Sequence, residues 1–218
     1  MGPQKVAIYG AGGFAREVAW LAESSDLDVV CFIDDDPHQR GKTLNGIPVM
    51  GLEDAKGRYP DASLVVAVGS PQVRERMAKK AADWGFSFAT IIHPRVERSR
   101  WIEVGDGSVI AAGNILTTNI RLGKHVQINL DCTIGHDVVM EDYVTLAPGV
   151  HVSGWVRLGK RVYVGTGAVI INGTKEAPLV IGDDAVIGAG AVVTKSVPTG
   201  VTVVGVPARP IRERRQKR

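Results

Sequence analysis

The sequence predicts an α/β chain in two parts, a Rossmann-like βαβ domain followed by a parallel β-helix of six-residue repeats. One observation is the repeat, in which aliphatic residues recur every six positions through the second half of the chain. The other is a glycine-rich turn between a short apolar run and an amphipathic segment near the beginning. The expected organisation is a Rossmann-like domain at 1–91, a β-helix at 92–206 and a basic tail at 207–218.

The first domain is expected to alternate strands and helices, as a doubly wound sheet does. Apolar runs bounded by glycine or aspartate indicate the strands, and amphipathic segments indicate the helices. Pro71 suits the first turn of the second helix. The expected strands lie at 5–9, 28–33 and 64–68, and the expected helices at 15–23 and 71–84.

The glycine turn fits the pattern G-x-G-x-x-A, in which glycines permit a tight turn and the helix N-terminus presents free N–H groups to anionic oxygen. Acidic residues follow the second strand, where they suit a ribose hydroxyl. In such a sheet a ligand lies beyond the carboxyl ends of the strands. The alternative is a structural turn that binds nothing. The candidate nucleotide contacts are Gly10, Gly12, Gly13, Asp34, Asp35 and Ser70.

The repeat in the second half predicts coils whose short strands share one narrow core. Arg98 stands where the first aliphatic residue is expected, so the first coil should be irregular, with docking against the preceding domain as one reason. Residues 173–179 interrupt the repeat and should form a loop. The aliphatic positions are Val104, Ile110, Leu116, Leu122, Ile128, Ile134, Met140, Leu146, Val152, Leu158, Val164 and Ile170, followed by Ile181, Ile187 and Val193.

Composition favours a soluble cytoplasmic protein. Hydrophobic residues make up 44% of the chain, and no apolar stretch approaches the ~18 residues of a membrane span. The first residues lack the features of a signal peptide. Cys31 and Cys132 are expected to be buried thiols that form no disulfide. The net charge of +3 is concentrated in the tail, which is either a solvated end or a contact for anionic phosphates. Nucleic acid and membrane partners are not expected.

Hexads such as 104–109 and 187–192 resemble those of the hexapeptide-repeat acyltransferases. The chain is more closely similar to bacterial sugar acetyltransferases that carry a small nucleotide-binding domain before the repeat, the sialic-acid and nucleotide-amino-sugar group. This resemblance implies a left-handed β-helix, a homotrimer, acetyl-CoA as acyl donor, and no metal.

By the same resemblance, His136 is the catalytic base and Asn129, seven residues earlier, contacts the acceptor. The chemistry agrees, because an amine or hydroxyl must lose a proton to attack a thioester and histidine titrates near neutral pH. Asp137 would orient the imidazole, provided that the pair lies at a corner, since adjacent residues on a strand face opposite ways. The backbone N–H of Gly154 would stabilise the oxyanion.

The resemblance also implies that coenzyme A lies in a groove between neighbouring β-helices, lined by small residues. These residues also fit the simpler explanation that the coils turn there. The loop at 173–179 either covers the cofactor of a neighbouring subunit or is neutral. The implied cofactor contacts, besides Gly154, are Thr166, Ala189, Gly190, Gly205 and Pro207.

The predicted activity is acetyl-CoA-dependent N-acetylation of a nucleotide-linked amino sugar of the 4-amino-4,6-dideoxy type. The alternative is O-acetylation of a sialic acid or a polysaccharide precursor. A remote alternative is a zinc-dependent, carbonic-anhydrase-like β-helix that uses His125, His136 and His151, although the close H-x₄-H pair of such sites is missing. His125 and His151 are expected to face solvent. A non-catalytic scaffold is disfavoured by the presence of His136, Asp137 and Asn129 together.

Overall fold

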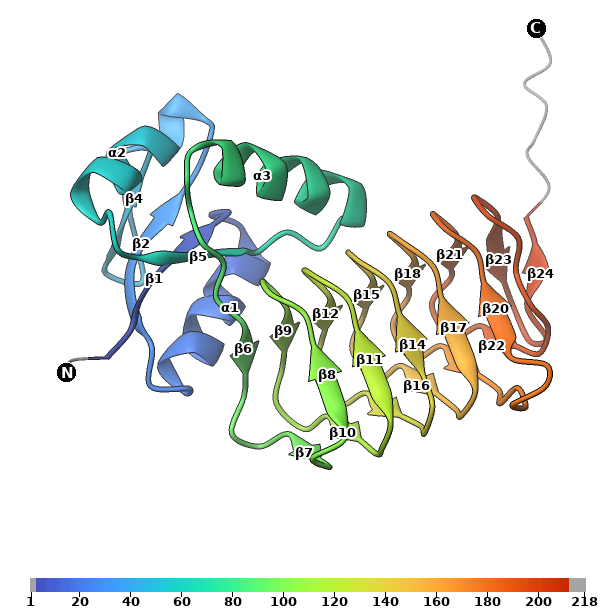
Figure 1. Ribbon diagram of the computed structural model, residues 1–218. Coiled ribbons are helices and arrows are strands. Elements are labelled where there is room, and N and C mark those ends of the chain that lie inside the picture. The colour runs from blue at the N-terminus through green and yellow to red at the C-terminus, as the bar shows by residue number, and fades with distance from the viewer. Residues whose placement is uncertain (1–2, 212–218) are drawn as a thin grey trace, which may run out of the picture.

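The computed structural model describes residues 3–211 and shows a small sheet domain beside a long β-helix (Figure 1). The first domain has five strands in the order β3-β4-β2-β1-β5, with all neighbours parallel except the β3–β4 pair. Its elements are β1 (Lys5–Tyr9), α1 (Gly13–Glu23), β2 (Asp28–Ile33), a 3₁₀ turn (Pro37–Gln39), β3 (Thr43–Leu44), β4 (Ile47–Met50), α2 (Leu52–Arg58), β5 (Ser63–Val66) and α3 (Pro71–Asp83).

The structure confirms the Rossmann-like order and shifts several boundaries. Helix α1 begins at Gly13, two residues earlier than expected, because Gly12 serves as its N-cap. Strand β5 ends at Val66, short of the expected residue 68. The β3–β4 hairpin and α2 were not predicted, although Asn45 and Gly46 at φ +50° and +80° form the kind of turn that Asn-Gly favours.

The second part is the predicted left-handed parallel β-helix, with three faces that each contribute about one short strand per coil. Face 1 contains β6 (Ile91–Ile92), β9 (Val109–Ile110), β12 (Gln127–Ile128), β15 (Thr145–Leu146), β18 (Tyr163–Val164), β21 (Val186–Ile187), β23 (Thr202–Val204) and β24 (Arg209–Pro210). Face 2 contains β7 (Glu97–Arg98), β10 (Ile115–Leu116), β13 (Thr133–Ile134), β16 (His151–Val152), β19 (Val169–Ile170) and β22 (Val192–Val193). Face 3 contains β8 (Ile102–Val104), β11 (Ile120–Leu122), β14 (Val139–Met140), β17 (Val156–Leu158) and β20 (Leu179–Ile181).

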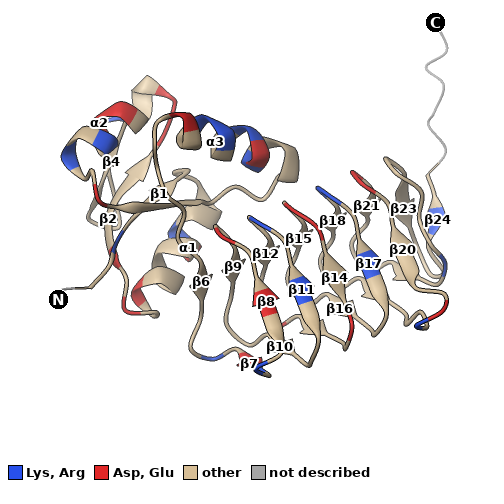
Figure 2. Cartoon of the chain, viewed as in Figure 1, with Lys and Arg blue, Asp and Glu red and all other residues tan. Residues whose placement is uncertain are grey.

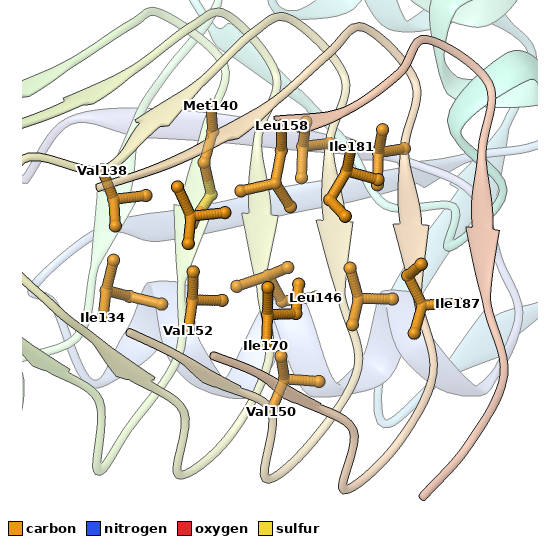
Figure 3. Packing of buried hydrophobic residues seen from close by; sticks show 14 of the residues in the cluster. Ile134, Val138, Met140, Leu146, Val150, Val152, Leu158, Ile170, Ile181 and Ile187 are labelled. Atoms are coloured by element: carbon orange, nitrogen blue, oxygen red, sulfur yellow. The ribbon is translucent and has the colours of Figure 1, made fainter. Parts of the chain in front are cut away.

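The aliphatic repeat residues form the core of the β-helix, where they stack in ladders from coil to coil (Figure 3). Ile134, for example, pairs with Val152 in the next coil, and both are buried. Full burial of such a side chain contributes roughly 1.5–3 kcal/mol. The loop prediction was wrong only at Leu179, which begins β20 and enters the same core.

The irregular first coil has a different reason from the suggested docking. Arg98 pairs in register with Leu116, but it lies exposed on face 2. The first domain packs instead on face 1, where Val109 and Ala111, with Leu130 packed against them, join the apolar cluster that contains the buried side of α1. An arginine is tolerated at position 98 because this end of face 2 remains open to water.

The same docking overturns the expectation for His125. Its side chain is 4% exposed and lies between Phe88, with ring centroids 4.5 Å apart, and Tyr143, at 5.2 Å. The repeat suggested a solvent-facing corner, whereas tertiary packing covers it. His151 is exposed, as expected, and its Nδ1 lies 2.8 Å from the hydroxyl of Thr133.

Charged residues gather on α2 and α3, and the face-3 strands β8, β11 and β17 each carry a charged residue (Figure 2). The face-3 pair Arg121–Glu103, at 3.2 Å, is highly exposed, and such surface pairs add little stability. Cys31 and Cys132 are free and buried. Within residues 3–211 no helix has the length and apolar character needed to cross a bilayer. Most of the predicted basic tail, residues 212–218, lies outside the described residues.

Candidate active site

His136 lies on the turn between β13 and β14, so it belongs to the edge that joins faces 2 and 3, here called the His136 corner. Asp137 follows it with φ +59°, in the left-handed region. This turn replaces the alternation of a strand and lets the two neighbouring side chains meet, with His136 Nδ1 2.8 Å from Asp137 Oδ2. The corner geometry that this pair requires is therefore present.

Gly154 lies one coil further along the same corner, and its backbone packs against the imidazole of His136. A Cβ on Gly154 would lie 2.6 Å from both Cε1 and Nε2 of His136, so only glycine leaves the ring in place. The N–H of Gly154 donates no hydrogen bond within residues 3–211. Trp155 stands beside the ring, edge-on at 84° with centroids 6.1 Å apart. A bare N–H donor and an exposed imidazole thus lie side by side.

The loop that interrupts the repeat leaves the β-helix at this corner. Its Gly173 N–H donates to Gly154 O at 3.0 Å, and Leu179 N–H donates to Trp155 O at 3.0 Å. The insertion therefore forms the next layer above Gly154 and Trp155. The spacing of the repeat predicts this loop, but only the stacking of the coils shows that the loop adjoins His136.

The remaining β-helix residues predicted for the site lie on a different edge, which joins faces 1 and 2 and is here called the Asn129 corner. Asn129 uses its side-chain amide to donate to Leu146 O at 2.8 Å. The structure thus brings together His136, Asp137 and Gly154 and separates them from the other predicted contacts of the same chain. The residues at the Asn129 corner are Asn129, Thr166, Ala189 and Gly190, with Gly205 and Pro207 following β23 at its far end.

The glycine turn of the first domain borders a cavity of about 450 Å³ at the carboxyl ends of its strands. Gly10, at φ +127°, is required there because a Cβ would lie 2.8 Å from Ala67 O. Ser70 does not line the cavity; it occupies the N-cap position of α3, where its side chain makes no capping hydrogen bond. The predicted residues that do line it are Gly10, Gly12, Gly13, Asp34 and Asp35, joined by Tyr9, Ala11, Phe14, Ile33, Ala67, Val68 and Met77.

Most of the additional lining residues gave no signal in the sequence, because apolar residues at strand ends look like core. Tyr9 is an exception in its chemistry, since its hydroxyl donates to Asp35 Oδ2 at 2.7 Å. Lys80 of α3 donates to Asp35 Oδ1 at 2.7 Å. Partial burial of Asp35 acts against ionisation, but these bonds from Lys80 and Tyr9 hold its pKa below the usual range. The cavity therefore keeps a charged carboxylate at its rim near neutral pH.

The three histidines of the zinc alternative lie apart: His125 at the edge joining faces 3 and 1, His136 at its own corner, and His151 within face 2. Among residues 3–211 no group of three or more His, Cys, Asp or Glu side chains is placed to hold a metal ion.

Comparison with known proteins agrees with both halves of the fold. Residues 5–81 match the family described as the PglD N-terminal domain. GDP-perosamine N-acetyltransferase of Escherichia coli O157:H7 is 36% identical over 210 residues, which cover 93% of this chain and 94% of that protein.

Several solved structures are similar over nearly the whole chain. A perosamine N-acetyltransferase from Caulobacter crescentus, with one histidine replaced by asparagine and with CoA and GDP-perosamine bound, superposes with a TM-score of 0.88 at 30% identity and covers 96% of this chain and 97% of its own. The acetyltransferase domain of PglB from Neisseria gonorrhoeae, with acetyl coenzyme A, has a TM-score of 0.85 at 33% identity and covers 96% of this chain and 100% of its own. Identity and coverage of this extent show that the chain belongs to the hexapeptide-repeat sugar acetyltransferase family that includes the GDP-perosamine N-acetyltransferases.

Proposed function

We propose that this protein transfers the acetyl group of acetyl-CoA to the amine of a nucleotide-linked 4-amino-4,6-dideoxy sugar. The observation that carries the proposal is the His136–Asp137 pair lying on Gly154, whose N–H has no acceptor among the described residues, in a chain that also has a nucleotide-sized cavity. Relatives crystallised with CoA and GDP-perosamine, or with acetyl coenzyme A, support the choice of substrates. Acetyl-CoA and nucleotide sugars are cytoplasmic metabolites, which favours a cytoplasmic enzyme.

The residues at the His136 corner fit direct transfer. An amino sugar is largely an ammonium ion at neutral pH, so a base must remove a proton before nitrogen attacks the thioester carbon. Asp137 holds Nδ1 of His136, which leaves Nε2 free to accept that proton. A C–N bond then forms, the attacking nitrogen releases its second surplus proton to solvent, the C–S bond breaks, and the proton held by the imidazole passes to the departing thiolate of coenzyme A. Gly154 N–H stabilises the oxyanion between these events.

The proposed enzyme is a homotrimer in which the site is shared between chains. The first domain packs on face 1, whereas the His136 corner joins faces 2 and 3 and is therefore the edge opposite to face 1. One chain cannot bring its own cavity to its own His136. A neighbouring copy that presents its cavity, with Thr166, Ala189 and Gly190 of its Asn129 corner, supplies the missing half, and a three-faced coil suits threefold packing.

The activity is tested by thiol release from acetyl-CoA with a panel of nucleotide 4-amino sugars that carry guanosine, uridine or thymidine. We expect turnover with one member of the panel. GDP-perosamine is the first choice, because similar proteins are named for this substrate or were solved with it bound. A silent panel from protein that still binds coenzyme A would contradict N-acetylation and would point to O-acetylation of a sugar hydroxyl.

The role of His136 is tested by His136→Ala. We expect turnover to fall at least a hundredfold, since a general base contributes roughly 10²–10⁴-fold, while coenzyme A affinity stays nearly unchanged. Mixing this variant with chains carrying a disrupted cavity, such as Gly10→Val, should restore part of the activity in mixed trimers. Wild-type turnover of His136→Ala would refute the base, and failure of the mixture to recover would refute the shared site.

A further inference from the structure

Arg74 is the largest fully buried side chain of the described structure, and it lies between the two domains. It projects from α3 and is 0% exposed. Burial lowers the pKa of Arg74 to about 9, which still leaves the guanidinium charged at neutral pH. Within residues 3–211 none of its hydrogen-bond acceptors is a carboxylate. An unpaired buried cation is costly, so this arrangement calls for an explanation.

The acceptors of Arg74 belong to two groups. Nε and Nη2 donate to the β-helix, at His125 O (2.9 Å), Tyr143 O (2.7 Å), Val144 O (3.2 Å) and Thr145 Oγ1 (2.9 Å). Nη1 donates to Gln127 Oε1 (2.9 Å) and to the segment 67–70, at Val68 O (2.8 Å) and Gly69 O (3.4 Å). One guanidinium therefore ties the segment 67–70, here called the cavity loop, to strands β12 and β15.

Two β-helix partners of Arg74 also bond the last residue of β5 and the cavity loop that follows it. Gln127 Nε2 donates to Val66 O at 2.9 Å, and Thr145 Oγ1 donates to Gly69 O at 3.0 Å. Both side chains are 1% exposed. Three buried polar side chains thus converge on the end of β5 and the cavity loop, and the bonds to Val66 O, Val68 O and, from Thr145, to Gly69 O are 2.8–3.0 Å long.

The cavity loop in turn shapes the proposed nucleotide site. Ala67 and Val68 line the cavity next to Gly10 of the glycine turn. Ala67 N–H donates to Tyr9 O at 2.8 Å, and Ala67 O sits so close to Gly10 that a Cβ there would be 2.8 Å away. A displacement of the loop by a fraction of an ångström would therefore alter the wall that the glycine turn faces.

We propose that Arg74 is a positioning residue that fixes the cavity loop against the β-helix and thereby sets the affinity for the nucleotide part of the acceptor. This inference rests on the proposed function for its kinetic test but not for its structural one. Arg74 does not line the cavity, so it acts through the loop. The five N–H donors of arginine, held in a planar fork, suit a junction with so many carbonyl acceptors.

The test compares Arg74→Met with Arg74→Lys. For Arg74→Met we expect at least a tenfold rise in KM for the nucleotide sugar, with KM for acetyl-CoA and kcat within about twofold of wild type. Arg74→Lys, which keeps the charge and three donors, should recover part of that loss. Amide hydrogen exchange over residues 64–70, measured without ligand, should quicken in the same order.

Arg161→Met is the matched control at the same domain interface. Arg161 joins α3 to the β-helix by bonding Glu75 (3.2 Å) and Asp184 (2.8 Å), but it does not bond the cavity loop. The Arg161→Met variant should have a lower melting temperature, with no change in KM for the nucleotide sugar or in amide hydrogen exchange over residues 64–70. If Arg74→Met does not fold, Thr145→Val removes one bond to Gly69 O and one to Arg74 and should give a smaller change in the same direction.

Unchanged KM and unchanged exchange in Arg74→Met would overturn the inference, and so would an equal rise in both KM values. If the wild type turns over no nucleotide sugar, the proposed function fails, but loop exchange in the Arg74 variants still decides the role of Arg74.

Discussion

Gly154→Ala should remove most of the activity while leaving the fold intact. The added Cβ would lie 2.6 Å from Cε1 and Nε2 of His136 and 3.0 Å from Cδ2, all shorter than ordinary van der Waals contact. The backbone of Gly154 does not have a positive φ, so alanine meets no conformational barrier there. The imidazole must therefore move by roughly 1 Å, and a misplacement of that size costs about 10²-fold in rate.

Stability should respond much less than rate. The side chain of His136 is 53% exposed, so the ring has space to swing toward water without opening the core. We expect a fall in kcat of about a hundredfold, which corresponds to roughly 2.7 kcal/mol in the barrier, with less than about 1 kcal/mol lost in folding. Gly57→Ala, in α2, is the control because a Cβ there meets nothing within 4 Å.

The assay is thiol release from acetyl-CoA at saturating substrates, with thermal melting measured in parallel. A double-mutant cycle isolates the mechanism, because Gly154→Ala should have little further effect in a His136→Ala background. Gly154→Ala with kcat within threefold of wild type would refute the reasoning that this glycine positions the base.

Two other predictions concern charge. Asp137→Asn keeps a residue that tolerates φ +59° but removes the negative charge 2.8 Å from His136. We therefore expect kcat to fall about tenfold or more, with little change in melting temperature. Asp26→Asn, at φ +58° outside the site, is the control and should change neither quantity. Desolvation, aided by the charge of Arg74, lowers the pKa of His125 from 6.5 to about 4. As the pH falls, the unfolded chain therefore binds a proton at this histidine before the folded chain does. The free energy of unfolding is unaffected above pH 6.5 and falls by about 3 kcal/mol in all as the pH approaches 4. Chemical denaturation from pH 7.5 to 4.5 should show a shallower loss in His125→Phe, and parallel curves for the two proteins would contradict the assignment.

The β-helix could be predicted because its information is local and repeated. Each aliphatic residue from Val104 to Ile170 predicts an inward position, and every coil repeats the same six-residue rule. The cavity beside the glycine turn could be predicted in the same way, because the order strand, Gly10, helix leaves space for a ligand at the end of a sheet. The hairpin at Asn45–Gly46 was missed although its turn residues were present, because its strands are too short to show a period.

The chemistry of the corner was only partly in the sequence. His136 was identified because its segment matches the His-Asp segment of the family that the chain resembles, but the pairing with Asp137 depended on a left-handed backbone that the spacing alone did not fix. The contact with Gly154, eighteen residues later, exists because coils stack, and no feature of the hexads themselves marks it.

The sequence by itself determined the two-part fold, the family resemblance and the position of the histidine, because these depend on short-range patterns of apolar residues and glycines. Tertiary structure alone decided that Asn129 and His136 occupy different edges, because a seven-residue step passes from one corner of the coil to the next. It also decided that His125 and Arg74 are buried. Arg74 is stable inside because distant parts of the chain supply its hydrogen bonds, whereas His125 Nδ1 is buried without a hydrogen-bond partner among the described residues and depends on the packing of Phe88 and Tyr143.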